Sequence, residues 1–348
     1  MKFKSTCLSR LWIRASLSTI LMVVLGNVVA EEQNRSSVDS EVTIAALRAK
    51  DFSAELTFEK HLYTKQEITG DLYSYLSDGL KVYALVNTPT KIAPDVGFPV
   101  LIYGHGFHPE PKKYAISSDG IVSRPGDYYR GIPERYARGG YLVITPDYRG
   151  YNISAGFEYT ERDSLSSSYY AVDVLHLISA IDKLPHANSN RLLYAGHSMG
   201  GDVGLKAMLA NNKITAASLW SPVIGSTAQR ALYYGRYYDK DKNVGVDQNK
   251  LTEYRKKIEG VYANLSIAIS AKDVDAINHL QYLMTPLIVH HARGDRSAPY
   301  QWVENLVVEM NELGKEFLFF SYDTNNHLFE GENLERAFER DLEFFSNY

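Results

Sequence analysis

One serine stands between two glycines in the segment 192–204, which reads LLYAGHSMGGDVG. Ser198 follows a short apolar run and precedes a stretch rich in helix formers, so the pattern predicts a strand, a tight turn and a helix. Side chains at Gly196 and Gly200 would collide with the neighbouring strand and helix in such a turn. Ser198 is therefore a candidate nucleophile. The alternative is an ordinary serine in a glycine-rich loop, because G-x-S-x-G arises by chance in about one such chain in ten.

A serine hydroxyl is a weak nucleophile at neutral pH and needs a base that is itself held by a carboxylate. In the chain order of a strand-turn-helix nucleophile, the acid and then the histidine follow at the ends of later strands. The strand expected at 285–295 ends in HARGDRSAP, which places Asp295 just past the sheet. The strand expected at 315–322 leads into DTNNH, which places His327 there. We predict a triad of Ser198, His327 and Asp295.

Other assignments compete with this one. Taken singly, Asp295 has the alternative of a turn residue and His327 that of a capping or packing histidine. His290 and His291 are poorer bases because they belong to the strand that supplies the acid, and His279 lies in a long insertion. Asp323, four residues before His327, is expected to shape its loop.

Acyl transfer also needs hydrogen-bond donors aimed at the oxyanion. We predict one donor in the backbone N–H of Met199, directly after the serine. The second is expected from the loop YGHGFHPE, where Gly104 and Gly106 let the backbone turn inward and Phe107 supplies the N–H.

Metal and cofactor chemistry finds little support in the sequence. His105 and His108 lie three residues apart but lack an evident third ligand, so a metal site there is weakly indicated. The only cysteine, Cys7, lies near the N-terminus. We predict that no metal or cofactor takes part.

The surrounding elements predict an α/β fold with a mostly parallel central sheet, helices on both faces and an N-terminal hairpin. The hairpin is expected at 72–89 around the turn at 77–79. Short apolar strands then alternate with helical stretches. The strands are expected at 98–106, 140–150, 191–196, 214–222, 285–295 and 315–322, and the helices at 127–138, 168–184, 199–211, 300–313 and 332–345.

The segment 225–284 interrupts this alternation and is longer than a simple crossover needs. We predict a small cap insertion there, with a surface insertion of no function as the alternative. A tyrosine cluster within it is expected to face the cleft and favour bulky substrates. The cluster comprises Tyr233, Tyr234, Tyr237 and Tyr238.

Residues 1–30 resemble a secretory signal peptide, because basic residues precede an apolar run that ends in small residues. An uncleaved membrane anchor is the alternative. Residues 31–70 are expected to form a leader and a surface helix, and residues 71–348 the catalytic domain. Cleavage would remove the only thiol and leave an exported protein, periplasmic or secreted, with no stable membrane association.

Charge argues against polyanionic partners. The chain of 348 residues has a formal net charge of −4, and removal of four basic residues with the leader gives −8. A mildly acidic protein is not built to bind nucleic acid. The expected partner is a small-molecule or short peptide substrate.

Several stretches together resemble the α/β-hydrolase fold and, within it, the catalytic domain of the prolyl oligopeptidase family of serine peptidases. They are SDGLKVYALVNTP, PVLIYGHGF, YARGGYLVITPDYRG, YAGHSMGG, TPLIVHHARGDRSAP and NNHLF, which together span about residues 70–348. The resemblance implies a serine hydrolase that cleaves peptide or ester bonds through an acyl-enzyme, with Ser198, Asp295 and His327 as its triad.

Two departures bear on the substrate. The large peptidases of this family carry a β-propeller, which residues 31–70 are too few to build. Prolyl oligopeptidases proper place a tyrosine at the position of His105, whereas the His-Gly form is similar to acylaminoacyl peptidases and many esterases. The alternatives are a carboxylesterase without peptidase activity and, from another class, a catalytically silent binding protein on a hydrolase fold.

Overall fold

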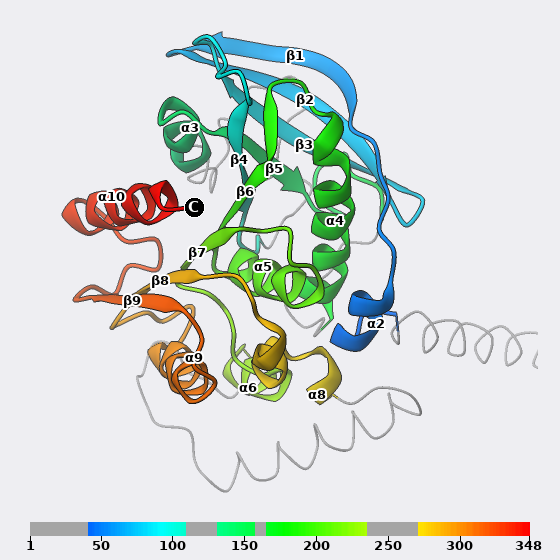
Figure 1. Cartoon of the computed structure of the whole chain (residues 1–348). Coiled ribbons are helices and arrows are strands. Elements are labelled where there is room, and N and C mark those ends of the chain that lie inside the picture. The colour runs from blue at the N-terminus through cyan, green and yellow to red at the C-terminus, as the bar shows by residue number, and fades with distance from the viewer. Residues whose placement is uncertain (1–40, 109–130, 157–164, 235–270) are drawn as a thin grey trace, which may run out of the picture.

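A computed structural model of the chain describes residues 41–108, 131–156, 165–234 and 271–348 (Figure 1). Within these ranges nine strands form one sheet, in the order β1-β2-β3-β5-β4-β6-β7-β8-β9. The strands are β1 (Thr57–Lys65), β2 (Ile68–Ser77), β3 (Leu80–Pro89), β4 (Phe98–Gly104), β5 (Leu142–Asp147), β6 (Ala187–His197), β7 (Ala216–Trp220), β8 (Leu287–Ala292) and β9 (Phe317–Tyr322).

The sheet changes from antiparallel to parallel at β5. Strands β1 to β3 pair antiparallel with one another, and β3 pairs antiparallel with β5. All pairs from β5 through β4, β6, β7 and β8 to β9 are parallel. Because parallel strands end at one edge, the loops after β4, β6, β7, β8 and β9 meet there. The hairpin between β2 and β3 turns at Asp78 and Gly79, both with positive φ, as the sequence predicts.

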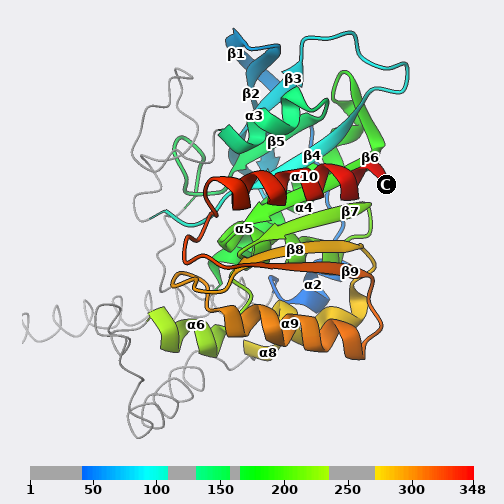
Figure 2. The same ribbon diagram turned by 90° about the vertical axis from the view of Figure 1, so that its left-hand side faces the viewer.

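Helices cover both faces of the sheet. In β4, Val100 and Ile102 pack into one core while Leu101 and Tyr103 pack into the other. The first core lies under α2 (Ile44–Ala49), α4 (Ser166–Ala180), α5 (Met199–Ala210) and α9 (Tyr300–Glu312). The second lies under α3 (Gly131–Arg138) and α10 (Glu332–Ser346), the face turned to the viewer in Figure 2. This arrangement confirms the predicted α/β sheet with helices on both faces.

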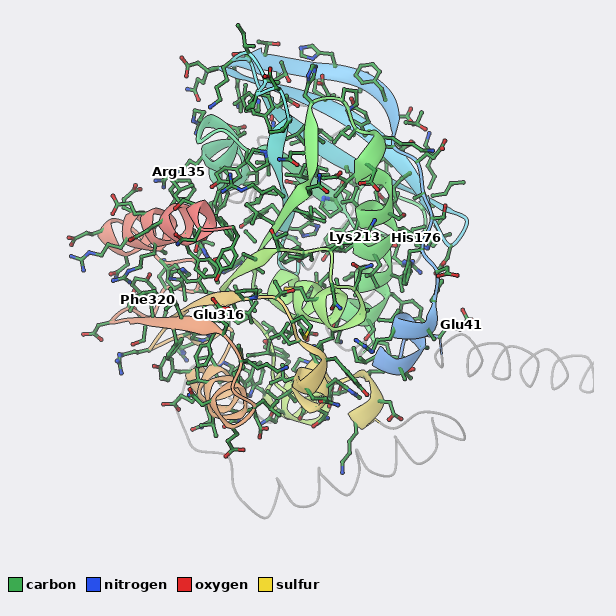
Figure 3. The ribbon with its side chains drawn as sticks, viewed as in Figure 1. Glu41, Arg135, His176, Lys213, Glu316 and Phe320 are labelled. Carbon is green, nitrogen blue, oxygen red and sulfur yellow. The ribbon has the colours of Figure 1, made fainter. Side chains whose placement is uncertain are left out.

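Helices α3 and α10 are joined at the surface by Arg135. Its guanidinium lies 2.6 Å from Glu335 Oε2 and 4.2 Å from the centre of the Phe338 ring. Figure 3 labels Arg135 where α3 approaches α10.

Asp341 fixes α10 to the central strands from within. Its carboxylate is fully buried and accepts hydrogen bonds from Ser218 Oγ (2.7 Å), Trp220 Nε1 (2.8 Å) and the Tyr136 hydroxyl (2.5 Å). It also lies 2.8 Å from His290 Nε2. A buried carboxylate with this many partners is stable only if all of them stay in place. Asp341 therefore holds β7 and β8, whose carboxyl ends lead into the candidate site, in a fixed relation.

The N-terminal segment has one short helix, where the sequence predicts a surface helix, and one strand that was not predicted. Helix α2 buries Ile44 and Leu47 in the core, and the Thr43 hydroxyl caps its first turn by accepting from Ala46 N–H at 3.1 Å. Strand β1 was not expected and pairs with β2 along its whole length. Its side chains are mostly exposed, so it lacks the apolar alternation by which strands are recognised in sequence.

The inserted segment is described only at its two ends. Helix α6 (Thr227–Tyr234) opens it, and α8 (Ala271–Val274) with the 3₁₀ helix η3 (Ala276–Tyr282) closes it. Residues 235–270, and the predicted signal peptide at 1–30, lie outside the described residues. Of the helices that the structure does describe, none has the length and apolar character to cross a membrane.

Candidate active site

Ser198 occupies a strained turn at the end of β6. Its φ is 57° and its ψ is −121°, and α5 begins at the next residue. Two hydrogen bonds to the end of β7 and the chain just after it hold the turn: Ser198 N–H donates to Trp220 O and Val223 N–H donates to Ser198 O, both at 2.9 Å. A positive φ at a non-glycine residue is costly and persists where the surroundings enforce it, most often at functional sites.

The flanking glycines are required for the close approach of backbone segments. A Cβ at Gly196 would lie 2.6 Å from Gly200 O, and a Cβ at Gly200 would lie 2.1 Å from Gly104 O. Both contacts would be with backbone atoms that cannot move aside. The structure thus bears out the predicted collisions and places the first turn of α5 directly against the loop after β4.

Asp295 and His327 meet on the loops that follow β8 and β9. His327 Nδ1 lies 2.6 Å from Asp295 Oδ2, while Asp295 Oδ1 accepts hydrogen bonds from Ser297 N–H (2.7 Å) and Ala298 N–H (3.0 Å). A carboxylate can only accept, so Nδ1 of His327 carries the proton and Nε2 is the acceptor nitrogen of the neutral ring. The Asp295 side chain is fully buried and that of His327 is one-fifth exposed.

The electrostatics of Asp295 favour its charged form. Burial raises the pKa of this carboxyl, but the hydrogen bond and charge of His327 and the Ala298 N–H outweigh it and leave the pKa below its usual value. Asp295 is therefore an anion at neutral pH, as is required of a group that orients an imidazole and stabilises its protonated form.

His327 also lies beside the nucleophile turn. Its carbonyl oxygen is 2.9 Å from Nε2 of His197, the residue that precedes Ser198, and the two imidazole rings have centroids 4.5 Å apart. His327 therefore contacts both Asp295 and the residue before Ser198, and all three predicted residues follow strands that end at the carboxyl edge of the sheet. That they act as a triad stays a prediction.

The loop after β4 is held by aromatic contacts around His105. His105 is buried, its Nδ1 donates to Gly106 O at 2.8 Å, and its ring lies 4.5 Å from that of Tyr148 and 4.8 Å from that of Tyr151. Burial lowers the pKa of His105 to about 4, so the ring is neutral at pH 7. Phe107 follows in this loop and packs against the core.

The histidines and carboxylates among the residues that the structure describes form no metal cluster. No group of three or more His, Cys, Asp or Glu side chains there could hold a metal ion. His290 contacts Tyr322 and Asp341 in the buried network, His291 Nε2 lies 2.9 Å from Ala298 O, and His279 Nε2 lies 2.9 Å from Lys272 O.

Two of the four predicted substrate-binding tyrosines contact the loop of the acid. The Tyr233 hydroxyl donates to Arg296 O and the Tyr234 hydroxyl to Ser297 O, both at 2.7 Å. Both rings pack on Trp302, with centroids 5.5 and 5.9 Å away. Tyr237 and Tyr238 lie outside the described residues. That any of these tyrosines contacts the substrate stays a prediction.

A buried ionic cluster under the nucleophile helix was not foreseen from the sequence. Asp202, one turn after Ser198, accepts from Arg230 at 2.8 Å and from Ser167 Oγ at 2.6 Å, and it lies 3.2 Å from Lys206 Nζ. Burial raises the pKa of Asp202, but the charges of Lys206 and Arg230 outweigh this and lower it. The only signal in the sequence is a pair of charged residues four apart on a helix that is otherwise apolar. Arg230 belongs to α6, so the cluster ties the inserted segment to α5.

The sheet order, the strained serine turn and the histidine–carboxylate pair together define an α/β-hydrolase. The sequence model of the prolyl oligopeptidase family matches residues 129–348, and the chain belongs to this family. As a member of this family it is a serine hydrolase.

Solved structures share the fold at low sequence identity. Acetyl xylan esterase from Paenibacillus sp. R4 is 19% identical with a TM-score of 0.60, over 88% of this chain and 92% of that one. Dipeptidyl peptidase 4 from Porphyromonas gingivalis is 18% identical with a TM-score of 0.54, over 87% of this chain but 37% of that one. An acylaminoacyl peptidase in complex with Z-Gly-Gly-Phe-chloromethyl ketone is 19% identical with a TM-score of 0.55, over 81% and 42%. A comparison with curated protein sequences gave no match.

Proposed function

We propose that the chain hydrolyses small esters or short peptides through an acyl-enzyme on Ser198. His327 is the general base, Asp295 orients its ring, and the amides of Met199 and Phe107 bind the oxyanion. The observation that carries the proposal is the 2.6 Å contact between His327 Nδ1 and Asp295 Oδ2 beside the strained turn at Ser198. That contact leaves His327 Nε2 as the nitrogen able to take a proton from a hydroxyl.

The reaction proceeds in two matching halves. Ser198 Oγ attacks the carbonyl carbon of the substrate while its proton passes to His327 Nε2, and the carbonyl oxygen becomes an oxyanion. The oxyanion collapses, the bond to the alcohol or amine breaks, and His327 returns the proton to that leaving group. Water then attacks the acyl-enzyme and gives a proton to His327. As the second oxyanion collapses, the bond from the acyl carbon to Ser198 Oγ breaks, His327 returns its proton to Oγ, and the carboxylic acid leaves.

Ester hydrolysis without peptidase activity is the second candidate. It is supported by the extent of the matches, because this chain spans nearly all of the Paenibacillus acetyl xylan esterase but only about two-fifths of the peptidases. Triad and oxyanion donors serve both bond types equally, so they do not separate the two candidates.

A substrate panel tests the proposal and separates its two forms. Aminoacyl and peptidyl nitroanilides are compared with aryl and alkyl esters, with Ser198→Ala as the control. Cleavage of any of them by the wild-type chain and not by Ser198→Ala supports the acyl-enzyme. Cleavage of esters alone favours the carboxylesterase. Equal rates for the wild-type chain and Ser198→Ala on every substrate would contradict the proposal.

We also propose that the protein is exported and loses residues 1–30. The support is the sequence pattern alone, in which basic residues precede an apolar run with small residues at its end. Intact mass of the exported product should correspond to a chain that begins at Glu31. A product that begins at Met1 and stays in the membrane fraction would show an anchor instead.

A further inference from the structure

His197, the residue before the nucleophile, contacts the loop that carries the base. It ends β6 and is fully buried, and its Nε2 lies 2.9 Å from the carbonyl oxygen of His327. A carbonyl oxygen can only accept, so Nε2 of His197 carries the proton and donates. His197 thus hydrogen-bonds the backbone of His327, and the two rings lie with their centroids 4.5 Å apart.

The chemistry of His197 suits a fixed donor. Burial lowers the pKa of this imidazole well below its usual value, and the neighbouring His327 lowers it further. The ring therefore stays neutral when His327 accepts a proton during the reaction. Asp295 remains the anionic partner of His327. His291 also lies near this pair, and burial lowers the pKa of its imidazole as well.

The loop after β9 is attached on two sides. Gly294 N–H donates to Thr324 O at 2.9 Å, which joins this loop to the loop of the acid. His197 joins the same loop to the nucleophile strand through His327 O. The first attachment keeps the base near Asp295. The second sets its position relative to Ser198, because His197 and Ser198 are consecutive in the chain.

We propose that His197 is a positioning residue that fixes His327 relative to Ser198 through its hydrogen bond to the His327 carbonyl. The inference rests on the proposed function, since it assumes that His327 is the base of Ser198. Proton transfer requires the two groups to be within hydrogen-bond reach, and a displacement of about 1 Å can cost about a hundredfold in rate. Loss of the donor should therefore lower kcat while substrate contacts, and with them KM, stay unchanged.

Two substitutions separate the hydrogen bond from the bulk of the ring. His197→Gln keeps an N–H donor at the same number of bonds from Cα as Nε2, whereas His197→Phe keeps an aromatic ring without a donor. We expect His197→Phe to lower kcat and the rate of fluorophosphonate labelling by about tenfold to a hundredfold, with KM unchanged. We expect His197→Gln to retain most of both.

The control is the same exchange at a buried histidine on another element. His176 on α4 has its Nδ1 3.1 Å from Ser53 O and its Nε2 3.0 Å from Asp78 Oδ1. His176→Phe should lower the melting temperature without lowering kcat. If His197→Phe matches the wild-type kcat, or if His197→Gln loses as much as His197→Phe, the positioning role is overturned.

A measurement on the wild-type protein covers the case in which His197→Phe does not fold. Nitrogen-15 spectra of the histidine rings should show His197 as a neutral ring protonated at Nε2 throughout the pH range of activity. A ring protonated at Nδ1 alone, or one that becomes charged near neutral pH, would overturn the inference. A wild-type chain that does not react with the probe at all would instead contradict the proposed function.

Discussion

The carboxylate of Asp295 contacts His327 through one oxygen and its own loop through the other. Oδ2 lies 2.6 Å from His327 Nδ1, while Oδ1 accepts the amides of Ser297 and Ala298 in its own loop. One oxygen therefore fixes the carboxylate and the other orients the imidazole. Because the aspartate is held independently of the histidine, the pair is preorganised before a substrate arrives.

This division of tasks predicts the effect of Asp295→Asn. The amide oxygen can still accept from Ser297 and Ala298, so the loop should keep its shape. The amide nitrogen cannot accept from Nδ1–H, so His327 should adopt the other tautomer and lose its basic Nε2. We expect kcat to fall by about 10⁴-fold with little change in KM, as measured by steady-state kinetics on an aryl ester. A loss below about tenfold would contradict the role of Asp295.

The buried His105 predicts a pH-dependent stability. Burial lowers the pKa of His105 from 6.5 to about 4, so the unfolded chain binds a proton in this range and the folded chain does not. Its contribution is fully present above pH 6.5 and is lost as the pH falls towards 4. We expect about 3 kcal/mol of the free energy of unfolding to be lost across this window through His105.

The variant His105→Asn isolates that contribution. Asparagine carries a donor at the distance of Nδ1 but does not titrate, so the bond to Gly106 O can persist. Urea titrations of both proteins between pH 4 and 7 should show a shallower fall in the free energy of unfolding for the variant. Parallel curves would mean that His105 is not held in its neutral form.

The contacts of Tyr233 and Tyr234 predict a loss that does not depend on substrate size. Their hydroxyls donate to Arg296 O and Ser297 O, directly after Asp295. The double change Tyr233→Phe and Tyr234→Phe removes both hydroxyls and keeps the rings on Trp302. We expect kcat/KM to fall by the same factor, about threefold to tenfold, on p-nitrophenyl acetate and on bulky esters. A loss confined to bulky substrates would instead support direct contact between these tyrosines and the substrate.

The close backbone packing at Gly200 predicts sensitivity to a single methyl group. A Cβ there would lie 2.1 Å from Gly104 O, so Gly200→Ala must push the loop after β4 away from α5. We expect a loss of about 1–3 kcal/mol in the free energy of unfolding together with loss of activity. Gly131→Ala is the matched control, because its Cβ would meet nothing within 4 Å. Equal behaviour of the two variants in melting and activity assays would refute this packing argument.

The sequence predicts those parts of the fold that are marked by a pattern of neighbouring residues, such as a run of apolar side chains or a glycine at a tight turn. The apolar strands from β4 to β9 and the helices between them are recognisable because buried parallel strands are apolar on both faces. Ser198, Asp295 and His327 could be singled out as candidates because each lies in the turn or loop that follows such a strand. Gly196 and Gly200 were informative because only a glycine allows the backbone approach seen there.

Features that depend on distant partners were not predictable. Strand β1 carries mostly exposed polar residues, and it is a strand only because its backbone pairs with that of β2. The hydroxyls of Tyr233 and Tyr234 bind backbone atoms more than 60 residues later in the chain. His197 meets His327 across a separation of 130 residues. No periodicity or spacing in the sequence encodes such contacts.

The most direct test of the central claim is to locate the residue that a fluorophosphonate modifies. The wild-type protein is treated with the probe, digested and analysed by mass spectrometry, with Ser198→Ala treated in parallel. The account predicts one phosphonylated peptide, modified at Ser198 after displacement of fluoride, and no modification of a folded Ser198→Ala. Modification of another residue, or equal labelling of Ser198→Ala, would contradict Ser198 as the nucleophile.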